Sequence, residues 1–277
     1  MTGNKAQIDY WNGPTGQKWA KHNSETDRNL SAAADAALKL ANALPGERVL
    51  DIGCGAGVTS FLLAERVGPE GHVTGVDVSQ PMLALARSRT SAPNIDFIEA
   101  DAALHPFAPE YDLIFSRFGV MFFVDPAAAF SNIRKGAAKD GRLAFVCWRV
   151  VEDNEWVSLP YAAARPVLPE QKPVHPHAPG PFAFADADRL RGILSTAGFS
   201  GIGIEKFDGM MELGASPQEA SFQVTQLMGP TARALRDVDD ATRAKAQEAV
   251  AQALAKVQTG TDDIRLGMAC WLVSAKA

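Results

Sequence analysis

Short apolar runs alternate with amphipathic stretches between residues 48 and 148, and this alternation is the clearest pattern in the chain. Five runs rich in apolar and β-branched residues predict strands at Arg48–Ile52, His72–Val78, Ile95–Ala100, Asp112–Phe118 and Arg142–Trp148. Three stretches between them predict helices at Val58–Val67, Gln80–Thr90 and Pro126–Ala138. Strands that alternate with helices in this way favour a doubly wound, mostly parallel sheet with helices on both faces.

The segments on either side of this core, residues 47–150, have different patterns. Residues 1–46 are predicted to form an N-terminal flap followed by an alanine-rich helix over Leu30–Leu44. Six prolines fall between positions 166 and 181, so residues 151–185 are predicted to be a lid or linker.

The remaining part, residues 186–277, is predicted to complete the sheet around a helical insertion. A helix is expected over Asp186–Ala197, and strands over Gly201–Leu213 and Ala269–Ala275. An alanine-rich and charged stretch at about 216–264 reads as helical, with a break near Gly229. We therefore expect a helical lid insertion between the last two strands.

Composition and charge exclude several classes of protein. The chain has 277 residues, 47% of them hydrophobic and 21% charged, with a net charge of −5 and no basic stripe, so a dedicated nucleic-acid binder is not expected. Its most apolar long window, Leu113–Val124, contains Arg117 and is far shorter than the ~20 residues that span a bilayer. The start lacks the apolar region of a secretory signal. Three widely spaced cysteines fit reduced thiols in a cytoplasm and offer no zinc site.

The candidate binding chemistry begins where the first predicted strand ends. Asp51 is followed by glycines at positions 53, 55 and 57 and then by a helix. Glycine allows close approach of the backbone to a ligand, and the amides of the following helix would point into the same cleft. By itself such a turn has two readings, a ligand cradle or an ordinary turn.

Two further acids end the next two predicted strands. Asp77 stands at the end of the second strand, 26 residues after Asp51, and Asp101 stands at the end of the third. An acid at the end of the second strand can accept hydrogen bonds from both ribose hydroxyls, although Asp77 could instead cap the helix at Gln80. Ser79 could provide that cap and leave the acid free. Three acids in register at one sheet edge favour a nucleoside-binding site.

These residues resemble the class I, Rossmann-like S-adenosylmethionine-dependent methyltransferases. The resemblance covers about residues 48–148, and it implies a seven-stranded sheet whose last strand is antiparallel. It also implies S-adenosyl-L-methionine as cofactor and S-adenosyl-L-homocysteine as product, with Asp77 at the ribose and Asp101 with Ala102 at the adenine. The implied cofactor-binding residues are Trp11, Trp19, Asp51, Gly53, Cys54, Gly55, Thr59, Asp77, Val78, Met82, Asp101, Ala102, Ser116 and Arg117.

Residues 10–19 and 116–123 are also similar to a bacterial small-molecule subgroup, close to the quinone-biosynthesis C-methyltransferases. The chain departs from that subgroup in its long helical insertion and in its apolar Met121-Phe122-Phe123, so a quinone acceptor does not carry over. A small apolar or aromatic acceptor is expected, with no nucleic acid. The oligomeric state is left open.

Two other functions compete with methyl transfer. An NAD-dependent oxidoreductase is disfavoured because Val58 stands where the last glycine of a dinucleotide-binding turn would be. A module that binds S-adenosylmethionine without turnover, acting through the helical insertion, would carry the same binding motifs.

No catalytic residue is assigned, because methyl transfer needs a general base only when the nucleophile must lose a proton. The candidates are His22, which could equally be a solvated histidine, and Arg117, which could hold an anionic acceptor or pair with Asp125 or Glu155. His175 and His177 lack a third ligand, so no metal site is expected.

Residues 8–22 are expected to be a mobile flap because their glycines and proline make a poor packing helix. In that flap, Tyr10, Trp11 and Trp19 would cover the sulfonium by cation–π contact, or they would instead hold the N-terminal segment against the core. Met121, Phe122 and Phe123 are either a pocket floor or a core stripe.

Overall fold

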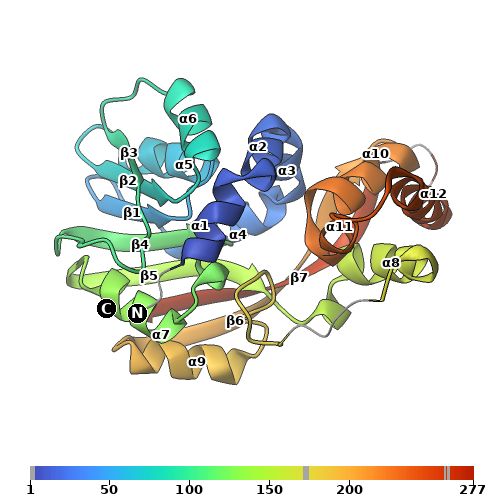
Figure 1. Cartoon of the computed structure of the whole chain (residues 1–277). Coiled ribbons are helices and arrows are strands. Elements are labelled where there is room, and N and C mark those ends of the chain that lie inside the picture. Colours follow the sequence, from blue (N-terminus) through green and yellow to red (C-terminus); the bar gives the residue numbers. More distant parts are fainter. Residues whose placement is uncertain (1–3, 171–174, 259, 261–262) are drawn as a thin grey trace.

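The computed structural model describes residues 4–170, 175–258, 260 and 263–277 (Figure 1). Seven strands of these residues form one sheet with the spatial order β3-β2-β1-β4-β5-β7-β6. Their bounds are β1 Arg48–Ile52, β2 His72–Asp77, β3 Ile95–Glu99, β4 Tyr111–Arg117, β5 Ala137–Trp148, β6 Ser200–Gly214 and β7 Ile264–Lys276. The first five strands pair in parallel, whereas β7 runs antiparallel to both β5 and β6. The predicted fold class, including the antiparallel last strand, is confirmed.

Helices cover both faces of the sheet because the chain winds outward from its centre in two directions. The helix α5, Val58–Val67, connects β1 to β2 on one side, and α7, Pro126–Arg134, connects β4 to β5 on the other. Right-handed crossovers in opposite directions place the two helices on opposite faces. The helix α4, Ser31–Ala41, packs beside α5, and α9, Ala187–Thr196, packs beside α7.

Several predicted boundaries agree closely with the structure. β1 and α5 begin and end at the predicted residues, and α6 spans Gln80–Ser88. The helix α7 ends four residues earlier than predicted, because β5 already begins at Ala137. The sequence pattern did not reveal α8, Glu155–Ala164, which contains Pro160.

The N-terminal segment is helical, so the expectation that its glycines and proline would prevent a packed helix was wrong. It forms α1, Lys5–Asn12, α2, Pro14–Lys21, and α3, Asn23–Asn29. Pro14 occupies the first turn of α2, where no amide partner is needed. A Cβ at Gly16 would lie 1.8 Å from the carbonyl oxygen of Trp11, so this glycine permits α2 to pack closely against the end of α1.

The helical insertion is present where the sequence predicted it. It consists of α10, Pro217–Phe222, a π-helix at Gln223–Leu227, α11, Gly229–Ala234, and α12, Asp240–Val257. With α8 it forms a lobe at one end of β7, and α1–α3 lie between this lobe and the rest of the sheet (Figure 1).

Several hydrogen bonds join the N-terminal helices to the insertion, and two of them reach the π-helix from α2. The indole Nε1 of Trp19 donates to the carbonyl oxygen of Leu227 at 3.0 Å, and Lys18 Nζ donates to that of Gln226 at 3.2 Å. The helices α1–α3, which we call the N-terminal cover, therefore contact the helical insertion at its π-helix.

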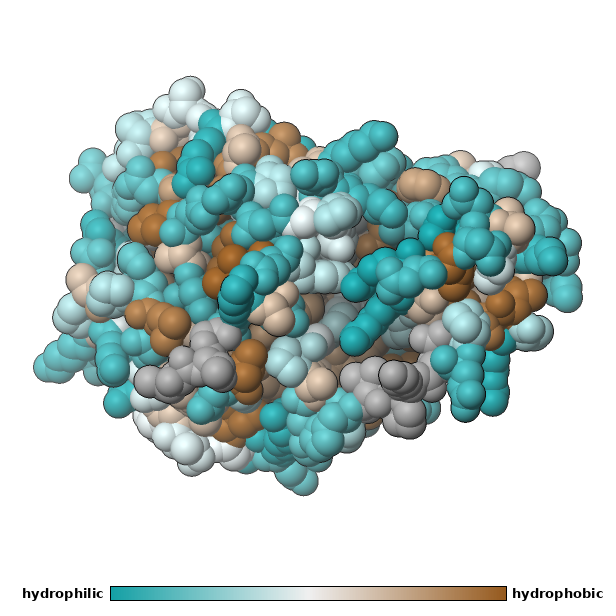
Figure 2. All heavy atoms as spheres, in the orientation of Figure 1, coloured by the Kyte–Doolittle hydropathy of each residue, from teal (hydrophilic) through white to brown (hydrophobic). Residues whose placement is uncertain are grey.

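On the face shown in Figure 2, hydrophobic residues lie in small groups among hydrophilic ones. All three cysteines are buried and free. Among the described residues, no helix is long and apolar enough to cross a membrane, and no cluster of side chains could hold a metal ion. His175 and His177 lie in an exposed turn with ring centroids 5.2 Å apart.

Candidate functional site

The parallel register brings the three predicted acids to one edge of the sheet. Asp51 pairs with Gly75, two positions before Asp77 on β2, and Asp77 pairs with Glu99, two positions before Asp101. Because parallel strands end at the same edge, the three carboxylates follow adjacent strand ends. The three acids therefore lie near one edge of the sheet, and their role in binding stays a prediction.

Asp51 is fully buried beneath the glycine loop, the turn that carries Gly53, Gly55 and Gly57. Its Oδ2 accepts hydrogen bonds from Thr59 Oγ1 at 2.8 Å and from Ser60 Oγ at 2.7 Å, both in the first turn of α5. Its Oδ1 is buried and has no hydrogen-bond partner among the described residues. Burial raises the pKa of Asp51 to about 6, although the two hydroxyls and the charge of Arg117 oppose this rise. Thr59 is one of the residues that the resemblance implied, whereas Ser60, which follows it directly, is not.

The glycine loop serves both packing and access. Gly53 has φ +68°, and a Cβ there would lie 2.6 Å from the Cα of Gly119, so the loops after β1 and β4 touch at this point. Gly55 has φ +56°, and a Cβ there would meet only Met82 Cε, at 3.2 Å. Gly53 is therefore required by backbone packing, whereas Gly55 leaves space beside Met82.

Asp77 binds the glycine loop to the end of β2. Its Oδ2 accepts from the Gly55 amide and its Oδ1 from the Ser79 amide, each at 2.8 Å. Burial raises the pKa of this carboxyl, while the amides oppose the rise. Each oxygen retains a second lone-pair direction for a ligand hydroxyl.

The side chain of Ser79 does not cap α6, Gln80–Ser88, as the sequence had suggested. Ser79 stands at the N-cap of α6 but its hydroxyl donates to the carbonyl oxygen of Trp11 at 2.8 Å. Asn12 provides the cap instead: its Oδ1 accepts from the Gln80 amide and its Nδ2 donates to the carbonyl oxygen of Val78, both at 2.8 Å. Asn12 thereby fixes α1 to the end of β2, a contact that the sequence analysis missed.

Asp101 lies at the third position of the edge. Its Oδ1 accepts from the Ala103 amide and from Asn4 Nδ2, each at 3.0 Å. Its Oδ2 is buried and has no partner among the described residues. Ala102 beside it is buried, and its carbonyl oxygen accepts from Asn132 Nδ2 at 3.1 Å.

An aromatic cluster lies beside the site. The Trp11 ring contacts those of Trp19 and Phe122, each with centroids 5.6 Å apart and nearly perpendicular planes. Met121 and Phe123 are buried in the hydrophobic core, so only Phe122 of this run joins the cluster. Of the two alternatives for this run, Met121 and Phe123 belong to the hydrophobic core.

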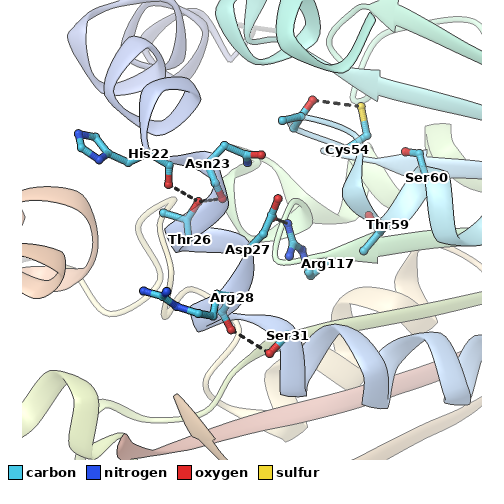
Figure 3. Close-up of polar contacts among 12 residues, drawn as sticks. His22, Asn23, Thr26, Asp27, Arg28, Ser31, Cys54, Thr59, Ser60 and Arg117 are labelled. Atoms are coloured by element: carbon cyan, nitrogen blue, oxygen red, sulfur yellow. Dashed lines mark hydrogen bonds and ion pairs between the residues drawn. The ribbon is translucent and has the colours of Figure 1, made fainter. Parts of the chain in front are cut away.

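Arg117 forms an ion pair with Asp27, and not with Asp125 or Glu155, which were one of its two alternatives. Its Nη2 lies 2.8 Å from Asp27 Oδ1 on α3, and both side chains are mostly buried (Figure 3). The guanidinium is therefore held by the N-terminal cover. His22 points away from Arg117, and its ring lies 3.3 Å from Glu25 and packs against Phe222 (Figure 3).

Two of the predicted binding residues serve the fold through their side chains. Ser116 Oγ donates to the carbonyl oxygen of Ile52 at 2.7 Å and accepts from the Gly119 amide at 3.1 Å. Cys54 is buried, and burial together with the Asp77 and Asp51 carboxylates raises the pKa of its thiol. Neither group is prepared for acid–base or nucleophilic chemistry.

The site fits a ligand that carries several hydrogen-bond donors. Unpartnered buried carboxylate oxygens at Asp51 and Asp101 cost free energy unless a ligand donor reaches them. S-Adenosylmethionine carries an ammonium, two ribose hydroxyls and an adenine amino group. The three acids could accept from these groups in that order along the edge, and the aromatic cluster lies near them.

Comparison with known proteins agrees with this arrangement. Residues 49–141 match the methyltransferase domain family. Aklanonic acid methyltransferase DauC from Streptomyces sp. (strain C5) is 38% identical over 104 residues, which cover 36% of this chain and 47% of that protein. Demethylmenaquinone methyltransferase from Listeria monocytogenes serotype 4a is 30% identical over 136 residues, which cover 48% and 57%. The chain thus matches about half the length of these relatives.

Solved structures share the fold over most of the chain. The YcgJ protein from Bacillus subtilis has a TM-score of 0.58 at 17% identity, covering 89% of this chain and 98% of its own. Phosphoethanolamine N-methyltransferase 2 from Haemonchus contortus, solved with S-adenosyl-L-methionine, has a TM-score of 0.54 at 18% identity, covering 88% and 52%. Residues 49–141 are thus similar in sequence to a methyltransferase domain, and the sheet around them has the fold of these solved structures.

Proposed function

We propose that the protein binds S-adenosyl-L-methionine and transfers its methyl group to a small-molecule acceptor by direct displacement. The observation that carries this proposal is the row of carboxylates at Asp51, Asp77 and Asp101, two of which keep a buried oxygen without a partner. The match of residues 49–141 to a methyltransferase domain supports it independently.

The bound cofactor would supply an electrophilic methyl group on a sulfonium. Asp51 would accept from the ammonium, Asp77 from the ribose hydroxyls and Asp101 from the adenine amino group. Gly55 would let the backbone approach the ligand, beside Met82 and Val78. These contacts would hold the cofactor along its length, from the ammonium to the base. Alignment of its methyl group with the acceptor would then supply most of the catalysis.

We propose a small apolar or aromatic acceptor. The cluster of Trp11, Trp19 and Phe122 supports this because it offers ring surfaces near the cofactor. The ring surfaces of Trp11 and Trp19 could also stabilise a sulfonium by cation–π contact. Arg117 is engaged by Asp27, so an anionic acceptor would have to compete with that ion pair.

The net charge of −5 and the free cysteines support two further parts of the proposal. An acidic chain without a basic stripe is not expected to act on nucleic acid. Free thiols suit a reducing compartment, and we propose a cytoplasmic location.

Ligand binding is tested first by thermal shift. We expect S-adenosylmethionine and S-adenosylhomocysteine to raise the melting temperature, because a ligand that binds only the native state stabilises it. NAD should leave the melting temperature unchanged. Stabilisation by NAD alone would overturn the proposal.

Turnover is tested by incubating the protein with S-adenosylmethionine labelled in its methyl group and a cell extract. We expect label in a small-molecule fraction. An Asp77→Ala protein serves as the matched control, because it should lose the cofactor. Binding without any transfer of label would favour the alternative, a cofactor-binding interaction module.

A further inference from the structure

Asn4 lies at the N-cap of α1 and uses both atoms of its amide to join distant parts of the chain. Its side chain is buried, and Nδ2 donates to Asp101 Oδ1 at 3.0 Å while Oδ1 accepts from the Val124 amide at 3.1 Å. The reverse orientation of the amide would oppose oxygen to carboxylate and nitrogen to N–H. The orientation is therefore determined by its two partners.

The consequence of this contact falls on the Asp101 carboxylate. Oδ1 receives two donors, Asn4 Nδ2 and the Ala103 amide. Oδ2 is buried and receives none from the described residues. Two donors on one oxygen fix the plane of the carboxylate and leave the other oxygen as a bare acceptor, which is costly unless a ligand donor meets it.

We propose that Asn4 is a positioning residue that makes the site specific for adenine. By holding Oδ1, it aims Oδ2 of Asp101 at the amino group of the base and disfavours a base that presents an oxygen there. This inference rests on the proposed function, because it assumes that the adenine end of the cofactor lies at Asp101.

The test compares two ligands and two variants by calorimetry. The ligands are S-adenosylhomocysteine and S-inosylhomocysteine, in which an oxygen replaces the adenine amino group. Asn4→Leu keeps the approximate shape of the side chain without a charge and removes both the donor to Asp101 and the acceptor for Val124, whereas Asn4→Ala also removes the bulk. Circular dichroism reports whether each variant folds.

We expect the wild type to prefer S-adenosylhomocysteine by about tenfold or more. In both variants this preference should fall by about 3- to 10-fold, the effect of one hydrogen bond of ordinary strength. Affinity for S-inosylhomocysteine should change less, because that ligand never gained the contact. Lys5→Ala, an exposed change in the same helix, should keep the wild-type preference.

The outcomes separate this inference from the proposed function. A wild type that binds neither ligand would refute the proposed function. A wild type that binds both ligands equally would show that Asp101 does not read the amino group. Variants that keep the wild-type preference, or lose affinity for both ligands in equal proportion, would show that Asn4 only anchors the N-terminus.

Discussion

Replacing Asp51 by asparagine should remove a pH dependence from ligand binding. Asparagine keeps an oxygen for the hydroxyls of Thr59 and Ser60 but cannot ionise. In the wild type, burial raises the pKa of Asp51 to about 6 from 3.8, and Oδ1 has no partner among the described residues. A ligand ammonium beside that oxygen would favour the ionised carboxylate and return the pKa toward 3.8.

The size of the effect follows from proton linkage. Below pH 6 the ligand would have to displace a proton from Asp51, so affinity for S-adenosylhomocysteine should rise with pH. For a full return of the pKa to 3.8, the gain between pH 5 and pH 7 is about ninefold, or ~1.3 kcal/mol.

The stability of the ligand-free protein should change in the opposite direction. The folded pKa of Asp51 lies above its unfolded value, so its stabilising contribution is present below about pH 4 and is lost as the pH rises through about 6. A shift from 3.8 to about 6 corresponds to a loss of up to ~3 kcal/mol.

The assay is calorimetry with S-adenosylhomocysteine at pH 5, 6 and 7, beside urea denaturation of the ligand-free protein. Asp51→Asn should give a flat affinity profile and lack the Asp51 part of the stability slope. Glu65→Gln, which removes an exposed charge from α5, should behave as the wild type. A flat profile in the wild type, or an equal slope in Asp51→Asn, would refute the reasoning.

Three further changes test the site and its cover. Asp77→Ala should weaken binding of S-adenosylhomocysteine by about 2–4 kcal/mol, on the order of 30- to 700-fold in calorimetry, whereas Glu99→Ala on the next strand should not weaken it. Unchanged affinity in a folded Asp77→Ala protein would show that Asp77 only holds the glycine loop in place. Arg117→Ala should lower the free energy of unfolding, measured by urea denaturation, by about 2–3 kcal/mol, because Asp27 stays largely buried without its cation. The additional change Asp27→Asn should recover part of this loss. Hydrogen exchange of residues 8–22 should slow when S-adenosylhomocysteine binds. If these residues are fully protected without ligand and the protein turns over normally after their removal, the segment serves only to pack against the core.

The elements that the sequence predicted best are those set by local signals. The run Arg48–Ile52 is a buried strand that leads into glycines, and Val58–Val67 carries a helical pattern, so β1 and α5 have the predicted bounds. The acids at 51, 77 and 101 were located by the rule that parallel strands end at one edge.

The features that the sequence did not reveal depend on contacts between distant residues. Gly16 looked unsuitable for a helix because its close packing against Trp11 is not visible in a pattern. The partner of Arg117 lies 90 positions away in Asp27, and Asn4 meets Asp101 across 97 positions. Polar side chains of these types are common at surfaces, so nothing in their spacing marks them as partners.

The position of β7 has a consequence for synthesis of the chain. The strand Ile264–Lys276 lies between β5 and β6, and no other strand of the described sheet pairs with β6. Strand β6 leaves the ribosome earlier but has no edge to join until β7 follows it. The five parallel strands can pair beforehand, so the edge that carries Asp51, Asp77 and Asp101 should form while the last side of the sheet is still open. Nascent chains arrested before residue 264 should therefore expose β6 to protease while protecting β1–β5.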